Sequence, residues 1–181
     1  MQIDAPTARR FIQAYMAFLG SLLPEQRKQG LQTTQWLVQA REVWQADPSL
    51  LLSYRRAQAD QAVALDEPML DAIAQMRMGR WIYLKDTRSY SVFLDAQATQ
   101  AYAVLGLTQR LRDVGLGGSG VTFTAGLVPL NGRWVCDGLL AEPLTLGPNY
   151  RREFNAQAQA LRQQGLFSER PKNADSAKET S

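Results

Sequence analysis

The spacing of apolar residues changes from helical to strand-like near Gly79, and this change limits the fold more than any other feature of the chain. Before it, apolar residues recur every three to four positions, as on the buried face of a helix. After it, short runs of aromatic and β-branched residues follow a period of two, as in strands. A run of helices followed by a run of strands is typical of the α+β class.

We therefore expect an α+β fold in three segments. Residues 1–78 form a helical segment, and residues 79–167 form a five-stranded antiparallel sheet with a covering C-terminal helix, packed with the helical segment as one unit. Residues 168–181 have almost no apolar side chains and are expected to be disordered.

Capping residues and prolines mark where the helices begin. The side chain of a capping residue accepts a hydrogen bond from an unpaired N–H group of the first turn, and proline has no N–H group to leave unpaired there. The predicted helices begin at Thr7, at Thr33 or Thr34, at Asp47-Pro48 and at Asp66-Glu67-Pro68, and Gly79 ends the fourth; a fifth covers residues 149–164.

The expected strands cover residues 80–84, 90–94, 101–105, 121–130 and 133–136. Asn131-Gly132 is the strongest hairpin signal in the chain. A short helix from Thr108 to Val114 separates the third and fourth strands. This order is also that of an OB-like barrel, which stays open as the alternative to the favoured open, curved sheet.

The chain has no histidine and one cysteine, Cys136, among its 181 residues. Histidine-based acid–base or nucleophilic catalysis is therefore excluded, as are zinc sites built from histidine and cysteine. No apolar stretch approaches the roughly 18 residues of a membrane span. A single cysteine fits a reducing compartment, so we expect a cytoplasmic protein of bacterial type, with no membrane partner, metal or cofactor.

Three blocks of the sequence stand out: Tyr102-x-Val104-Leu105-Gly106-Leu107, Pro129-x-x-Gly132 with Asp137-Gly138-Leu139-Leu140, and Gly147 followed by Arg151-Arg152-x-x-Asn155. In these blocks the chain resembles a family of bacterial proteins of unknown function. The resemblance covers most of residues 10–167 and implies a shared fold without an established activity.

The chain departs from that family pattern at the first expected strand. Tyr83 stands where members of the family show a histidine, and residues 86–89 loosen the basic run that follows. Relatives with a cysteine-rich metal-binding segment at one end also differ from this chain, which has none.

The best local candidate for an anion site is the start of the last helix, where a glycine turn precedes two arginines. Helix N-termini attract anions through the helix dipole and unpaired N–H groups. The alternative for the arginines is that one of them pairs with Asp137 or Glu153 and fixes the helix. The alternative for Asp137 is that its side chain hydrogen-bonds to its own backbone in a turn. The candidate anion-binding residues are Tyr150, Arg151, Arg152, Asn155, Arg133 and Asp137.

The first strand and the turn after it combine aromatic and basic residues, which on an exposed sheet would stack bases and contact phosphates. The candidate nucleic-acid residues are Arg80, Trp81, Tyr83, Lys85 and Arg88, and alternation predicts that Trp81, Tyr83 and Lys85 share one face. The alternative is that these aromatic rings belong to the core.

The favoured interpretation is a non-enzymatic cytoplasmic interaction protein with an unidentified protein partner. No catalytic residue is assigned. The first alternative is a weak single-stranded nucleic-acid-binding module, and the last is an enzyme or sensor for an anionic small molecule.

Overall fold

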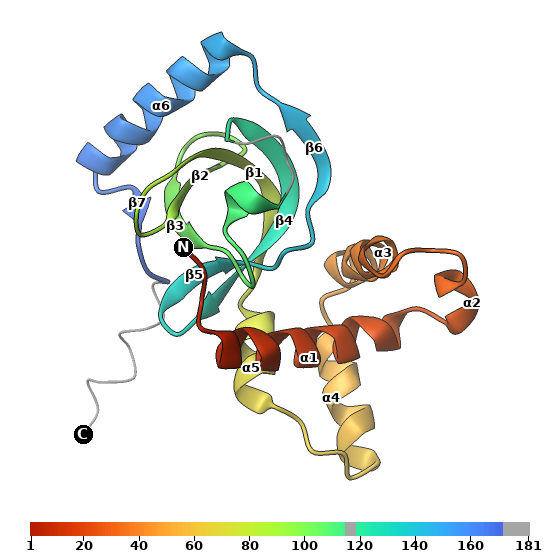
Figure 1. Cartoon of the computed structure of the whole chain (residues 1–181). Helices are drawn as coiled ribbons and strands as arrows, with labels where there is room; N and C mark the ends of the chain where they lie inside the picture. The colour runs from red at the N-terminus through yellow and green to blue at the C-terminus, as the bar shows by residue number, and fades with distance from the viewer. Residues whose placement is uncertain (115–118, 172–181) are drawn as a thin grey trace, which may run out of the picture. The chain divides into compact units, whose positions relative to one another are not determined.

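A computed structural model describes residues 1–114 and 119–171 of the chain (Figure 1). The fold is α+β, as predicted, with six α-helices and seven strands in the described part. The chain divides into two compact units: residues 4–75 are one, here called the helical unit, and residues 1–3 with 76–181 are the other, here called the sheet unit.

The helical unit contains five helices. They are α1 (Ala5–Leu22), α2 (Glu25–Lys28), α3 (Thr33–Ala46), α4 (Leu50–Asp60) and α5 (Glu67–Ala74). α1 begins before the predicted Thr7, because the Asp4 carboxylate caps it and accepts a hydrogen bond from the Thr7 backbone N–H at 2.9 Å. None of the helices in the described ranges is both long and apolar enough to cross a membrane.

Phe18 is the centre of the helical unit. Its ring is fully buried and meets Trp44 of α3 edge-on, with ring centroids 5.2 Å apart. It also contacts Tyr54 of α4 at 5.4 Å. Because each ring pair buries a large apolar area, these contacts hold α1, α3 and α4 together.

The sheet unit is built on a ring of five strands: β1 (Arg77–Asp86), β2 (Ser91–Asp95), β3 (Ala101–Leu105), β4 (Val121–Leu130) and β5 (Arg133–Cys136). The pairing order is β1-β2-β3-β5-β4, and β4 pairs back to β1 (Figure 1). The β3–β5 pair is parallel, so the sheet is mixed rather than wholly antiparallel. The ring has the strand order of the OB-like alternative, with the short helix η1 (Leu111–Asp113) between β3 and β4.

β1 begins three residues earlier than predicted. Gly79 was expected to end a helix, but it lies inside β1 opposite Ala125 of β4. Backbone pairing with β4 already starts at Arg77, opposite Leu127, so tertiary pairing overrides the local stop signal.

Two short strands were not predicted. β6 (Ala141–Thr145) pairs with β4, although its sequence has the composition of a proline- and glycine-rich link. β7 (Phe167–Ser168) pairs with β3 at the point where the disordered tail was expected to begin. Both exist through pairing with distant residues, for which a local pattern gives no signal. Residues 172–181 of the predicted tail lie outside the described residues, as do residues 115–118.

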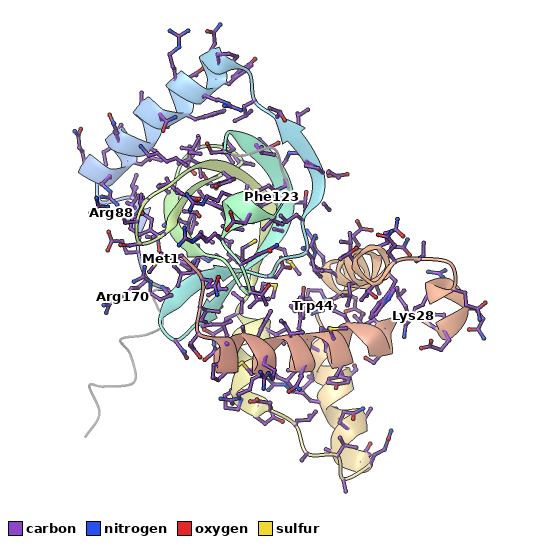
Figure 2. The ribbon with its side chains drawn as sticks, viewed as in Figure 1. Met1, Lys28, Trp44, Arg88, Phe123 and Arg170 are labelled. Carbon is purple, nitrogen blue, oxygen red and sulfur yellow. The ribbon has the colours of Figure 1, made fainter. Side chains whose placement is uncertain are left out.

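The ring separates two apolar clusters. Its interior holds mostly aromatic and branched side chains, including Phe123, which Figure 2 shows inside the ring, and the fully buried Cys136. The outer side carries Ile82, Leu84 and Val92, which are covered by Ala158 and Leu161 of α6 (Pro148–Gln163). The predicted covering C-terminal helix is thus confirmed (Figure 1).

The connection after β3 depends on Gly106. Its backbone pairs with the first residues of the chain, through Ile3 N–H to Gly106 O and Gly106 N–H to Met1 O, both at 3.0 Å. A Cβ at position 106 would lie 1.9 Å from the backbone oxygen of Gln109. Only glycine therefore lets this connection fold back tightly before Arg110 and Arg112.

We predict that Gly106→Ala lowers the free energy of unfolding by about 1–3 kcal/mol, because the clash is with backbone atoms that have little freedom to move. Gly79→Ala is the matched control, since its Cβ would meet Trp81 at an ordinary 3.8 Å. Urea denaturation of both variants measures the difference, and equal stability of the two would contradict the close approach.

A second prediction concerns the helical unit, where Arg10 and Asp66 form a two-pronged ion pair with both N–O distances at 2.8 Å. The hydrogen bond from Arg10 lowers the pKa of Asp66. A carboxylate with a lowered folded-state pKa stabilises the fold above its ordinary pKa, and this contribution is lost as the pH falls toward the lowered value.

Asp66→Asn should therefore lower the urea midpoint at neutral pH and reduce the further loss of stability between neutral pH and about pH 3. The exposed Asp60→Asn serves as the control, with the same charge change. An acid sensitivity identical to that of the unaltered chain would show that the pair does not act in this way.

Candidate functional site

A β-bulge in β1 positions the first residues of the candidate site. The register shifts between Tyr83, opposite Phe93, and Lys85, opposite Val92. The extra residue reverses the alternation, so Lys85 lies on the outer side with Val92 and Ala158 rather than on the face of Tyr83. Asp86 instead contacts interior groups, since it hydrogen-bonds to the Tyr83 phenol and accepts from the Ser91 hydroxyl at 2.5 Å.

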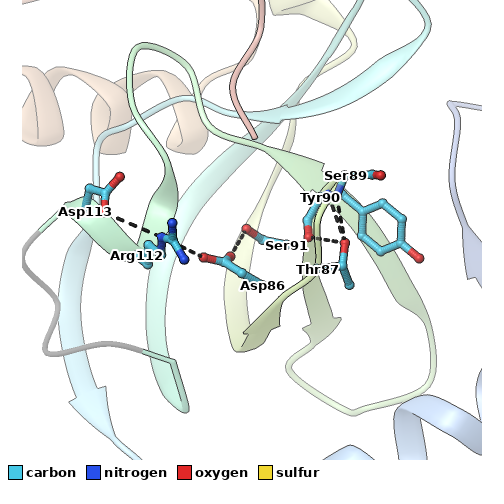
Figure 3. Close-up of polar contacts among 7 residues, drawn as sticks. All are labelled: Asp86, Thr87, Ser89, Tyr90, Ser91, Arg112 and Asp113. Atoms are coloured by element: carbon cyan, nitrogen blue, oxygen red, sulfur yellow. Dashed lines mark hydrogen bonds and ion pairs between the residues drawn. The ribbon is translucent and has the colours of Figure 1, made fainter.

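The turn between β1 and β2 is tied by Thr87. Its hydroxyl donates to the Tyr90 carbonyl at 2.7 Å and accepts from the backbone N–H groups of Ser89 and Tyr90 at 3.2 and 3.0 Å (Figure 3). These bonds fix the turn without using Arg88, whose side chain is exposed. Arg88 is thus held at a defined place with its guanidinium in solvent.

A second arginine reaches the same place from η1. Arg112 of η1 lies 3.9 Å from Asp86 and 3.7 Å from Asp113 (Figure 3). Leu111 beside it is buried in the interior cluster and anchors η1 at this end of the ring. Because the Arg112 side chain is 53% exposed, its ion pairs are weak and its charge stays available to a ligand.

These residues line an open cavity of about 540 Å³, here called the arginine pocket. Within residues 1–114 and 119–171, no hydrogen bond or ion pair joins Arg88 or Arg110 to another side chain. The lining therefore includes three guanidinium groups and one carboxylate, that of Asp86. The lining residues are Met1, Asp86, Thr87, Arg88, Arg110 and Arg112.

The charge of the whole sheet unit has the same sign. Its described residues carry eleven basic and seven acidic side chains, a formal charge of +4. The helical unit carries seven basic and eight acidic side chains, a formal charge of −1. An anion approaching the sheet unit is therefore attracted before it reaches the pocket.

Burial raises the pKa of Tyr83 well above its ordinary value, and the charge of Asp86 and the hydrogen bond to it raise it further. The phenol therefore stays protonated and remains a donor to Asp86. Arginine is also charged at every physiological pH. The guanidinium groups around the pocket thus supply hydrogen-bond donors and positive charge that suit an anion.

The predicted nucleic-acid residues are divided among three places. Trp81 and Tyr83 are buried in the ring interior, where the Trp81 indole donates to the Ala125 carbonyl at 2.9 Å, so the alternative that these rings are core is confirmed. Arg80 bonds Thr122 at 3.0 Å and pairs with Glu142 at 3.3 Å. Lys85 and Arg88 lie near the β1–β2 turn, and their part in nucleic-acid binding stays a prediction.

The predicted anion residues on α6 are mostly turned to local partners. Arg151 donates to the Leu146 carbonyl at 3.2 Å, and Arg152 donates to the Asn149 side chain at 2.9 Å. Asn155 donates to the Arg151 carbonyl at 2.7 Å. Tyr150 is 59% exposed and stacks on Phe154.

Arg133 and Asp137 lie in and just after β5, away from the start of α6. In Figure 1, β5 and the start of α6 lie on opposite sides of the ring of strands. Asp137 is buried and accepts from the Leu139 N–H at 3.1 Å, which confirms its interpretation as a turn residue. The six anion candidates are therefore not brought together, and anion binding by them stays a prediction.

The arginine pocket itself was missed by sequence reasoning. Arg110 and Arg112 are 22 or more positions from Arg88, and only closure of the ring brings η1 to the β1–β2 turn. The available signal was two arginines in a short connection between strands. No group of three or more His, Cys, Asp or Glu side chains suited to a metal ion occurs in the part of the chain that is described.

We predict that Tyr83→Phe lowers the free energy of unfolding by about 1.5 kcal/mol, because it removes a buried donor to a charged carboxylate while keeping the ring. Tyr150→Phe, at an exposed position, is the control and should change little. Chemical denaturation checks both variants. Unchanged stability of Tyr83→Phe would mean that the phenol does not hold Asp86.

No family model, curated protein or solved structure matches the chain. The resemblance to a bacterial family therefore stays a prediction.

Proposed function

We propose that the sheet unit is a non-enzymatic module that binds single-stranded nucleic acid through its phosphates, with the arginine pocket as the contact site. The observation that carries this proposal is the arginine pocket itself, where Arg88, Arg110 and Arg112 surround about 540 Å³ of open space. Arginine is the side chain best matched to phosphate, since its planar fork donates two parallel hydrogen bonds.

The form of the pocket favours a chain-like ligand over a small enclosed one. Arg88, Arg110 and Arg112 are all exposed, and the cavity is open to solvent. A backbone with successive phosphates can contact several of these cations while its remaining parts stay in water. The excess of positive charge on the sheet unit supports the same class of ligand.

The strand order of the ring gives support by analogy. OB folds share this order and bind oligonucleotides with one face of the sheet and with the loops after strands one and four. Here α6 covers the outer side of β1 and β2, while Thr87, Arg88 and Ser89 of the β1–β2 turn stay exposed. A shared strand order is not a shared function, so the arginine pocket remains the main argument.

The protein partner favoured by the sequence stays a prediction without a proposed site. Exposed large apolar side chains include Leu52 on α4 and Leu144 on β6, which belong to different units. Singly exposed apolar residues are normal on protein surfaces and do not mark an interface.

The proposal predicts salt-dependent binding of a fluorescently labelled oligothymidylate, measured by anisotropy. Each phosphate contact on a single strand changes the slope of log K against log salt by about −0.7, so three arginines predict a slope of about −2. Arg88→Ala/Arg110→Ala should weaken binding and make the slope shallower by about 1.4.

The matched control is Arg9→Ala/Arg56→Ala, which removes two exposed arginines from the helical unit and changes the net charge equally. It should leave the slope unchanged. Equal effects of the two double variants would point to diffuse charge attraction rather than a site, and no binding at low salt would overturn the proposal.

A further inference from the structure

A second cavity, of about 200 Å³, lies on the outer side of the same turn and is here called the aromatic pocket. Thr87 lines both cavities, so the two are neighbours on either side of the β1–β2 turn. The aromatic pocket is lined by Lys85, Thr87, Tyr90, Val92, Ala158, Gln159, Arg162 and Phe167.

Two partly exposed aromatic rings meet in this pocket. Tyr90 precedes β2 and Phe167 begins β7, and their ring centroids are 5.8 Å apart at an angle of 53°. Arg162 of α6 lies 4.0 Å from the Phe167 ring and donates a hydrogen bond to the Tyr90 hydroxyl. These contacts hold both rings in place, so the pocket presents fixed aromatic surface rather than mobile side chains.

The chemistry of the walls selects a flat, partly polar group. Buried Val92 and Ala158 form an apolar floor, while the exposed amide of Gln159 offers hydrogen bonds at the rim. The volume is below the roughly 300 Å³ at which pockets for drug-sized ligands begin, which suits a single ring system. Lys85 adds positive charge beside it, and so does Arg162, which also lies 3.6 Å from the Glu169 carboxylate.

We propose that the aromatic pocket takes one unstacked base of the strand whose phosphates contact the arginine pocket. This inference rests on the proposed function, and it assigns to Tyr90 and Phe167 the stacking role that the sequence assigned to Trp81 and Tyr83. A strand that crosses the β1–β2 turn would then be held by its backbone on one side and by a base on the other.

The test compares an oligothymidylate with a strand of the same length made of abasic residues, each titrated against the full chain by anisotropy. The unaltered protein should bind the base-containing strand at least about five-fold more tightly, the lower end of what stacking on an aromatic side chain contributes. Phe167→Leu should remove this preference and leave the affinity for the abasic strand and its salt slope unchanged.

Two further variants separate stacking from other effects. Phe167→Tyr keeps an aromatic ring and should keep the preference, whereas Tyr150→Leu removes an exposed ring elsewhere and should also keep it. Loss of the preference in Tyr150→Leu would contradict the assignment to this pocket. Thermal unfolding of each variant shows that it is folded before its affinities are compared.

The outcomes distinguish the two proposals. Equal binding of base-containing and abasic strands by the unaltered protein would overturn the base pocket and leave the phosphate site standing. Absence of binding to both strands would overturn both. The comparison of the two strands needs only the unaltered protein. It therefore tests the inference even if Phe167→Leu does not fold.

Discussion

The pairing between β1 and β4 is the contact on which the rest of the sheet unit depends. It runs from Arg77 opposite Leu127 to Tyr83 opposite Val121, and it joins the two ends of a sheet that would otherwise stay open. Once the ring is closed, most side chains on the inner face are buried and form an aromatic core. Ring closure also brings the connection after β3 to the same end as the β1–β2 turn.

The candidate site follows from two local features at that end of the ring. The bulge after Tyr83 turns Asp86 toward the interior and Lys85 toward the outer side. The β1–β2 turn therefore contributes residues both to the arginine pocket and to the aromatic pocket. The connection that turns tightly at Gly106 carries Arg110 and Arg112, which line the same cavity as Arg88. Phosphate binding and base stacking are thus assigned to neighbouring pockets that share Thr87.

The sequence predicted elements well where a strand carries its own pattern: the bounds of β3, β4 and β5 agree with those expected. The sequence-based prediction failed where pairing with distant residues determines the structure. β6 has the composition of a link, β7 is too short to show a pattern, and the bulge in β1 leaves no local signal. Aromatic residues on a strand are compatible with core and with a binding surface, and only ring closure shows that Trp81 and Tyr83 are core. The arginine pocket was missed for the same reason.

Chemical-shift mapping of the isotopically labelled chain, titrated with a short oligothymidylate, tests the account most directly. The account predicts that backbone shifts concentrate in three segments that are far apart in sequence, residues 85–92, 110–113 and 162–168. Shifts confined to the helical unit or to the start of α6, or none at saturating oligonucleotide, would contradict it.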